Sequence, residues 1–287
     1  MHCRHQTNDE QTKFWNGVGG DAWIDLQALL NQMFKPFTDL LIEASSARLV
    51  GRVLDVGCGT GSMTLAFARL LGVNGCCTGI DISEPLVAAA RARAEQEDTS
   101  ARFIRADAQT HVFPPACFDM LLSRFGVMFF DDPVQAFANL RRAARKHAEF
   151  RFIAWRSPSE NPFMTTAERA AAPLLPGIPA RRSDAQGQFA FADRLRIFSL
   201  LEEGGWDDID IRPIDVVCTL PEKELVRYFT RLSPLGRVLQ EVDARARIQV
   251  IETVRGAFDP YVHGAEVRFT AACWIVSARA AFTPAAP

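Results

Sequence analysis

Three glycines on alternate positions, Gly57, Gly59 and Gly61, constrain the fold of this chain more than any other feature. An apolar run at 53–56 precedes them, and the segment 62–71 follows with the apolar spacing of a helix. Glycines allow sharp turns and close approach of a ligand to the backbone because they have no Cβ atom. The free amides of the new helix face the same ligand. The stretch therefore predicts a strand, a tight turn and a helix that hold a small molecule.

The spacing of these glycines favours one kind of nucleotide ligand over another. A dinucleotide-binding turn has the pattern Gly-x-Gly-x-x-Gly, but here Ser62 stands where the third glycine belongs. Asp55, at the strand end, would repel a diphosphate and attract a positively charged ligand. We keep two alternatives to a cationic cofactor: an NAD(P)-dependent oxidoreductase and a catalytically inactive cofactor-binding protein.

The run V-L-D-V-G-C-G-T-G at 53–61 resembles motif I of the class I S-adenosylmethionine-dependent methyltransferases at every position. The runs W-N-G-x-x-G-x-x-W at 15–23 and S-R-F-G-V-M-F-F-x-D-P at 123–133 are similar to the type 11, ubiquinone/menaquinone C-methylase-like group. The resemblance implies a Rossmann-like, doubly wound α/β sheet of seven strands, with S-adenosylmethionine as cofactor and S-adenosylhomocysteine as product. It also implies that the first run binds the cofactor through Asp55, Gly57, Cys58 and Gly59.

Acidic residues end the next two predicted strands, at 75–81 and 102–107. Asp81 lies about twenty residues beyond the turn, where a carboxylate can accept both ribose hydroxyls in either class of fold, and Ile82 stands beside it. The resemblance implies that Asp107 meets the adenine amino group and that Ala108 leaves room for the ring. An aspartate that ends a strand also commonly caps a turn, and this alternative stays open for Asp107.

A fourth strand is predicted over 118–130, bending at Gly126. Because carboxyl ends of parallel strands line the ligand crevice, we expect Ser123, Arg124 and Phe125 to reach the site. Ser123 and Arg124 are assigned to the cofactor. Phe125 and Met128 either bind the substrate or belong to the core.

The N-terminal arm, residues 1–46, is polar and predicted to be disordered up to about Glu10. An amphipathic helix or helix pair follows, with a break at Pro36. Trp15 and Trp23 flank a glycine-rich bend and either attach the arm to the core or close over a ligand, since an aromatic ring stacks on adenine or faces a cation. The resemblance implies a cofactor-binding lid.

The remaining chain divides into core and cap segments. We expect a cofactor-binding core at 47–156, a helix and sixth strand at 193–218, and a last strand and tail at 267–287. Insertions at 157–192 and 219–266, the second largely helical, form a cap above the crevice. Phe163 and Tyr228 either line an apolar acceptor pocket or fill the cap's own core.

The amino-acid composition limits the kinds of partner that we expect this protein to bind. The formal charge of −2 does not favour nucleic acid, and the sequence has neither a membrane-spanning apolar run nor a signal peptide pattern. Seven cysteines without C-x-x-C spacing support neither a disulfide framework nor a metal site. We expect a cytoplasmic monomer or homodimer. Cys58 is either a reactive thiolate at a helix N-terminus or a packed thiol.

No catalytic residue stands out in the sequence. The sulfonium of S-adenosylmethionine makes its methyl group electrophilic, so the protein must align a nucleophile and exclude water. His111 and His263 are weak candidates for a base, and the alternative interpretation of each as a surface residue is the favoured one. An enolised carbon acceptor would need no dedicated base. The expected acceptor is a small molecule of aromatic, quinone-like or secondary-metabolite type.

Overall fold

The computed structural model describes residues 6–45, 51–175, 178 and 187–280. The N-terminal arm forms four helices: α1 (Gln6–Trp15), α2 (Val18–Asp25), α3 (Gln27–Met33) and α4 (Lys35–Ser45). The prediction of disorder up to Glu10 is therefore wrong for residues 6–10. The predicted break at Pro36 is confirmed, because this proline stands in the first turn of α4, where the missing N–H has no helical partner to lose.

Parallel strands form one side of the sheet and antiparallel strands the other. The parallel strands are β1 (Gly51–Val56), β2 (Gly75–Asp81), β3 (Arg102–Arg105), β4 (Phe118–Arg124) and β5 (Ala144–Trp155). The antiparallel strands β6 (Trp206–Pro221) and β8 (Glu266–Ala280) complete the order β3-β2-β1-β4-β5-β8-β6. The two-residue strand β7 (Val262–His263) adds an eighth strand to the predicted seven. The chain reverses its winding direction between β1 and β4, where α/β sheets bind ligands.

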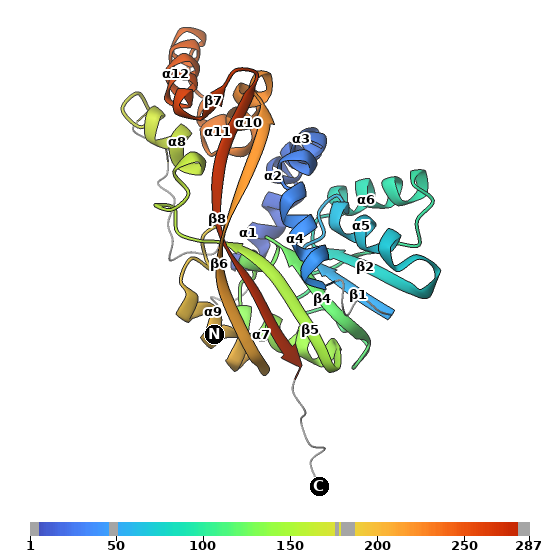
Figure 1. Cartoon of the computed structure of the whole chain (residues 1–287). Coiled ribbons are helices and arrows are strands. Elements are labelled where there is room, and N and C mark those ends of the chain that lie inside the picture. The colour runs from blue at the N-terminus through green and yellow to red at the C-terminus, as the bar shows by residue number, and fades with distance from the viewer. Residues whose placement is uncertain (1–5, 46–50, 176–177, 179–186, 281–287) are drawn as a thin grey trace.

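Helices cover the sheet as the alternating pattern predicts (Figure 1). Helix α5 (Ser62–Leu71) packs on β1 and β2, and α6 (Glu84–Gln96) packs on β2 and β3. Helix α7 (Pro133–Ala143) packs on β5, and α9 (Arg194–Glu203) on β6. The predicted strand 118–130 is too long: β4 ends at Arg124, a turn follows, and η3 (Val127–Phe129) is a 3-10 helix.

The cap stands on a ribbon of two strands that leaves the sheet (Figure 1). Strand β5 pairs with β8 only as far as Trp155 and Cys273. Strands β6 and β8 continue to pair with each other up to Pro221 and Glu266. The chain between them is largely helical: η4 (Glu222–Glu224), α10 (Leu225–Leu232), α11 (Leu235–Val238), α12 (Ala244–Ala257) and η5 (Asp259–Tyr261).

The first cap insertion contributes α8 (Pro162–Ala171), which packs against α12. Aromatic rings join the cap to the ribbon: Phe163 of α8 stacks on Phe269 of β8, with ring centroids 3.8 Å apart. Buried apolar residues of the arm, sheet and cap form one continuous cluster. The cap is therefore packed as an extension of the core. None of the described helices is long and apolar enough to span a membrane.

Candidate functional site

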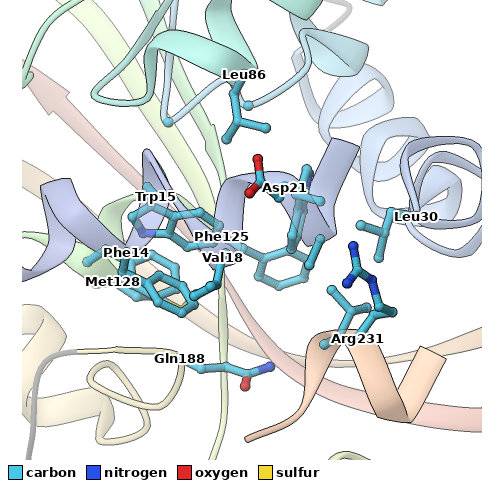
Figure 2. Close-up of a pocket in the computed structure, with 18 of the residues that line it drawn as sticks. Phe14, Trp15, Val18, Asp21, Leu30, Leu86, Phe125, Met128, Gln188 and Arg231 are labelled. Atoms are coloured by element: carbon cyan, nitrogen blue, oxygen red, sulfur yellow. The ribbon is translucent and has the colours of Figure 1, made fainter. Parts of the chain in front are cut away.

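A cavity of about 910 Å³ opens where the carboxyl ends of β1, β2 and β4 meet the arm and the cap. Its volume lies near the upper end of the range for small-molecule sites. Figure 2 shows Phe14 and Trp15 of the arm facing it, together with Phe125 after β4 and Arg231 of the cap. The site therefore combines three segments that are far apart in the sequence.

The three glycines of the turn have left-handed backbone conformations, with φ of 70° at Gly57, 53° at Gly59 and 81° at Gly61. A Cβ atom at Gly57 would lie 2.6 Å from the Cα of Gly126, and one at Gly61 would lie 2.8 Å from the ring of Phe103. At Gly59 the nearest atom would be Nε1 of Trp23, 3.6 Å away. Of the three, Gly59 alone borders open space. Gly57 also lines the cavity, but its missing Cβ makes room for the backbone after β4 and not for a ligand.

Asp81 ends β2 inside the cavity wall, with Ile82 next to it. Its Oδ2 accepts a hydrogen bond from the amide of Gly59 at 2.8 Å, and its Oδ1 accepts one from the amide of Ser83 at 2.9 Å. Burial raises the pKa of this carboxyl, and the amide bonds oppose that rise. The two amides fix the carboxylate between the glycine turn and α6.

Asp55 does not line the cavity, contrary to the expectation of direct contact with the cofactor. Its side chain lies between β1 and α5, where Thr64 Oγ1 donates a hydrogen bond to Oδ2 at 2.6 Å. The other oxygen, Oδ1, has no hydrogen-bond partner among the described residues. Burial raises the pKa of Asp55 to about 6, although the Thr64 bond and the charge of Arg124 lower it. The alternation of side chains along β1 explains this position behind the turn.

Asp107 and Ala108 line the cavity after β3. Asp107 Oδ1 also accepts a hydrogen bond from the amide of Gln109 at 2.9 Å. Asp107 therefore caps the turn and lines the cavity as well. Asn139 of α7 supports the loop by donating to the carbonyls of Ala108 at 2.9 Å and His111 at 2.8 Å. The loop is thus held in place from the layer behind it.

The arm is bonded to the end of β2. Ser83 Oγ donates to the carbonyl of Trp15 at 2.6 Å, and Asn16 Oδ1 accepts from the amide of Glu84 at 2.9 Å. The Trp15 ring meets Trp23 and Phe129 edge to face, with centroids 5.9 and 5.3 Å apart. Both tryptophans line the cavity. The arm therefore covers the site and is attached to the core at the same place.

The strand-four residues take different positions. Ser123 is fully buried outside the cavity lining, where its hydroxyl donates to the carbonyl of Val56 at 2.8 Å and accepts from the amide of Gly126 at 3.2 Å. The prediction that Ser123 contacts the cofactor is therefore wrong. Its side chain links β1 to the turn after β4. Arg124 does line the cavity, and burial lowers its pKa to about 10, against the opposing charge of Asp55. It is still a cation at neutral pH.

Aromatic side chains form another part of the cavity wall. The ring of Phe125 stacks on Trp155 with centroids 4.4 Å apart and an angle of 6° between planes. Met128, Phe163 and Tyr228 line the same space, so all four residues predicted for the substrate are at the cavity. Trp155 was missed, yet it ends the strand beside β4, and the rule that selected Phe125 would have found it.

The arm and cap also meet at the rim of the cavity. Arg231 of α10 forms an ion pair with Asp25 of α2, and Arg227 donates to the carbonyl of Asp25 at 2.6 Å. Sequence reasoning gave no sign of this contact between residues about 200 positions apart. The polar lining residues Asp21, Gln188, Arg237, Gln240 and Glu241 were missed for the same reason.

Neither candidate histidine lies at the cavity. The His111 ring packs edge to face on Phe113, with centroids 4.6 Å apart. His263 lines a separate hollow of about 410 Å³ on the cap. Cys58 does line the main cavity, but burial raises the pKa of its thiol well above the ordinary value. Cys58 is a packed thiol, and the thiolate alternative is wrong.

The residues present fit an adenosine-containing cofactor. Gly59 leaves space against the backbone, Asp81 presents a fixed carboxylate, and the buried Gln11 Oε1 at the cavity has no hydrogen-bond partner among the described residues. An unpartnered buried acceptor is costly unless a ligand or water meets it. Apolar and aromatic walls with a few directed polar groups are typical of small-molecule sites.

Comparison with known proteins agrees with this site. A family model described as "Methyltransferase domain" matches residues 53–147. Aklanonic acid methyltransferase DauC of Streptomyces sp. (strain C5) is 33% identical over 108 residues, which are 37% of this chain and 49% of DauC. This chain therefore matches about half the length of that relative.

A second relative covers more of the chain. The ubiquinone/menaquinone biosynthesis C-methyltransferase UbiE of Hahella chejuensis (strain KCTC 2396) is 26% identical over 197 residues, 64% of this chain and 78% of UbiE. The crystal structure of YcgJ from Bacillus subtilis shares the fold, with a TM-score of 0.57 and 16% identity over 86% of this chain and 98% of YcgJ.

The fold and the matched domain define a Rossmann-like α/β protein that contains a methyltransferase domain. Residues 53–147 thus match the methyltransferase-domain family, and the relatives that match longer stretches of the chain are methyltransferases. The NAD(P)-dependent alternative has no support in these comparisons.

Proposed function

We propose that this protein transfers the methyl group of S-adenosylmethionine to a flat, largely apolar small molecule. One observation carries the proposal: a single cavity is lined both by the glycine turn and Asp81 and by the stacked rings of Phe125 and Trp155. The names of the two relatives support it, since one acts on aklanonic acid and the other takes part in ubiquinone and menaquinone biosynthesis.

The chain's own residues bind and orient the two reactants. Asp81 would accept the ribose hydroxyls, Asp107 and Ala108 would border the adenine, and Gly59 would let the ligand approach the backbone. When bound, S-adenosylmethionine supplies an electrophilic methyl group. The arm covers the cavity with Trp15 and Trp23 and excludes water, and fixed alignment of two reactants supplies much of the acceleration in such transfers.

Phe125 is the residue best placed to orient a flat acceptor. Its φ of 66° is strained for a bulky side chain, and strain of this kind collects at functional sites. The rings of Phe34, Phe37 and Trp155 hold it in that conformation. Aromatic rings prefer offset stacks and edge contacts with other rings, so this part of the cavity wall favours an aromatic or quinone-like molecule.

Labelled methyl transfer tests the proposal. The protein would be incubated with S-adenosylmethionine carrying a tritiated methyl group and with a naphthohydroquinone, an anthraquinone carboxylic acid or ethanolamine. We expect label in one or both ring compounds and none in ethanolamine. Transfer to ethanolamine alone would contradict the acceptor class. Binding of the cofactor without transfer to any acceptor would favour an inactive cofactor-binding protein. A cytoplasmic location and a monomeric or homodimeric state are also proposed, on the sequence alone.

A further inference from the structure

The side chain of Phe163 in α8 belongs to the walls of two separate spaces. It lines the main cavity of about 910 Å³ and also the hollow of about 410 Å³ that contains His263, here called the cap hollow. Among the described residues, Phe163 alone lines both spaces. The residue is buried, with 1% of its surface exposed. The main cavity and the cap hollow therefore approach each other at this side chain.

The aromatic neighbours of Phe163 divide between the two spaces. Phe258 and Tyr228, with centroids 5.1 and 5.5 Å from that of Phe163, line the main cavity. Phe269 and Tyr261, with centroids 3.8 and 5.0 Å away, line the cap hollow. The Phe163 ring thus stands between two groups of aromatic rings, one for each space.

The backbone beside Phe163 is fixed to the ribbon that carries the cap. Asn161, which precedes α8 and is buried, pairs its side-chain amide with the backbone of Ala272 in β8. Its Nδ2 donates to the carbonyl of Ala272 at 2.9 Å, and its Oδ1 accepts from the amide of Ala272 at 2.9 Å. Helix α8 also packs against α12 (Figure 1). A close-packed ring next to such an anchor cannot move aside without losing its contacts.

We propose that Phe163 limits the length of the acceptor, because its ring is a fixed wall between the main cavity and the cap hollow. The inference rests on the proposed function and adds a residue that selects among flat acceptors by their length. Aromatic rings on both sides of the wall suit a flat ligand. A smaller side chain at position 163 would join the two spaces and let a longer ring system pass from one into the other.

The test compares a short and a long ligand by titration calorimetry. Protein saturated with S-adenosylhomocysteine is titrated with 2-naphthol and with 6-phenyl-2-naphthol, which is the same phenol lengthened by one ring. The quantity measured is the ratio of the two affinities, long over short. In Phe163→Leu we expect this ratio to rise between about 10-fold and 100-fold above the wild-type value, as for burial of one further phenyl ring.

Two matched controls each remove a buried ring and leave Phe163 in place. Phe229→Leu enlarges the main cavity alone, because Phe229 does not line the cap hollow. Phe269→Leu enlarges the cap hollow alone, because Phe269 does not line the main cavity. In each control the ratio should change less than about threefold. A similar rise in all three variants would show that looser packing, and not a wall at Phe163, governs the ratio.

Urea denaturation shows whether each variant is folded. If Phe163→Leu is not, Phe163→Met takes its place, since a flexible methionine fills irregular space and should change the ratio in the same direction. An unchanged ratio in a folded Phe163 variant, with 2-naphthol still bound, would overturn the inference and leave the proposed function standing. Failure of the wild type to bind S-adenosylhomocysteine or either naphthol would refute the proposed function, and the inference with it.

Discussion

Single residues of the glycine turn have separate roles that substitution can distinguish. Gly57→Ala places a Cβ atom 2.6 Å from the Gly126 backbone at a φ of 70°, so we expect a loss of about 2 to 4 kcal/mol in the free energy of unfolding. Gly59→Ala meets no clash and should cost about 1 to 2 kcal/mol for its backbone conformation. Gly59→Ala should also weaken S-adenosylhomocysteine binding to the folded protein, because the added Cβ atom would occupy space that the ligand needs. Urea denaturation and calorimetry check both values, and equal stability losses would contradict the assignment.

Asp55 makes stability depend on pH. Its pKa is raised from 3.8 to about 6 by burial, so the folded state binds this proton more tightly than the unfolded state does. Its contribution is therefore most favourable below about pH 4, falls as the pH rises to about 6, and is constant above. The whole change amounts to roughly 1 to 3 kcal/mol. Asp55→Asn should remove it: the difference in free energy of unfolding between variant and wild type should grow in favour of the variant from pH 4 to pH 7. A difference independent of pH would show that Asp55 titrates normally.

The turn after β4 combines strain with a role in binding. At the φ of 66° that Phe125 adopts, glycine is unstrained and alanine is not. We expect the free energy of unfolding of Phe125→Gly to exceed that of Phe125→Ala by up to about 1 kcal/mol. The relief of backbone strain in the glycine variant outweighs the greater freedom of its unfolded chain. Both variants should lose acceptor binding while they keep cofactor affinity. Thermal unfolding and titration with 1-naphthol measure the two effects, and loss of cofactor affinity in both variants would refute a role limited to the acceptor.

At the scale of elements, the arm is held at its α1–α2 corner. Trp15 contributes its carbonyl to Ser83 and its ring to Phe129 and Trp23. Trp15→Ala keeps the backbone bond and removes the ring contacts. If the arm closes over the cofactor, the variant should release S-adenosylhomocysteine several-fold faster, as measured by stopped-flow fluorescence. A lower melting temperature with an unchanged release rate would show that the ring only attaches the arm.

The same elements show which features the sequence could predict. Glycines, strand-ending acids and apolar periodicity are local, so the strand, turn and helix at 52–71 and Asp81 at the cavity follow from neighbouring residues. The side of β1 that Asp55 faces depends on Thr64 packing behind it, and the clash that requires Gly57 comes from Gly126, about 70 residues away. Contacts of this kind depend on tertiary packing, which local patterns do not encode.

At the scale of the whole molecule, the site is assembled by three layers that meet over one sheet edge. The sheet supplies Asp81 and Arg124, the arm supplies Trp15, and the cap stands on the β6–β8 ribbon with Arg231 paired to Asp25 of the arm. The sequence analysis predicted the cap as an insertion, but it did not predict the two-stranded ribbon that carries the cap. That ribbon depends on the pairing register of β6 and β8, which local sequence patterns do not give. Arm and cap thus close one cavity from opposite ends of the sequence.

Calorimetric titration with S-adenosylhomocysteine and with NAD tests the central claim, that this cavity is built for a methyl donor, most directly. We predict that the wild type binds S-adenosylhomocysteine and not NAD, and that Asp81→Ala weakens binding by about 1 to 3 kcal/mol through the loss of its hydrogen bonds to the ribose. Binding of NAD in place of S-adenosylhomocysteine, or an affinity unchanged in Asp81→Ala, would contradict the account.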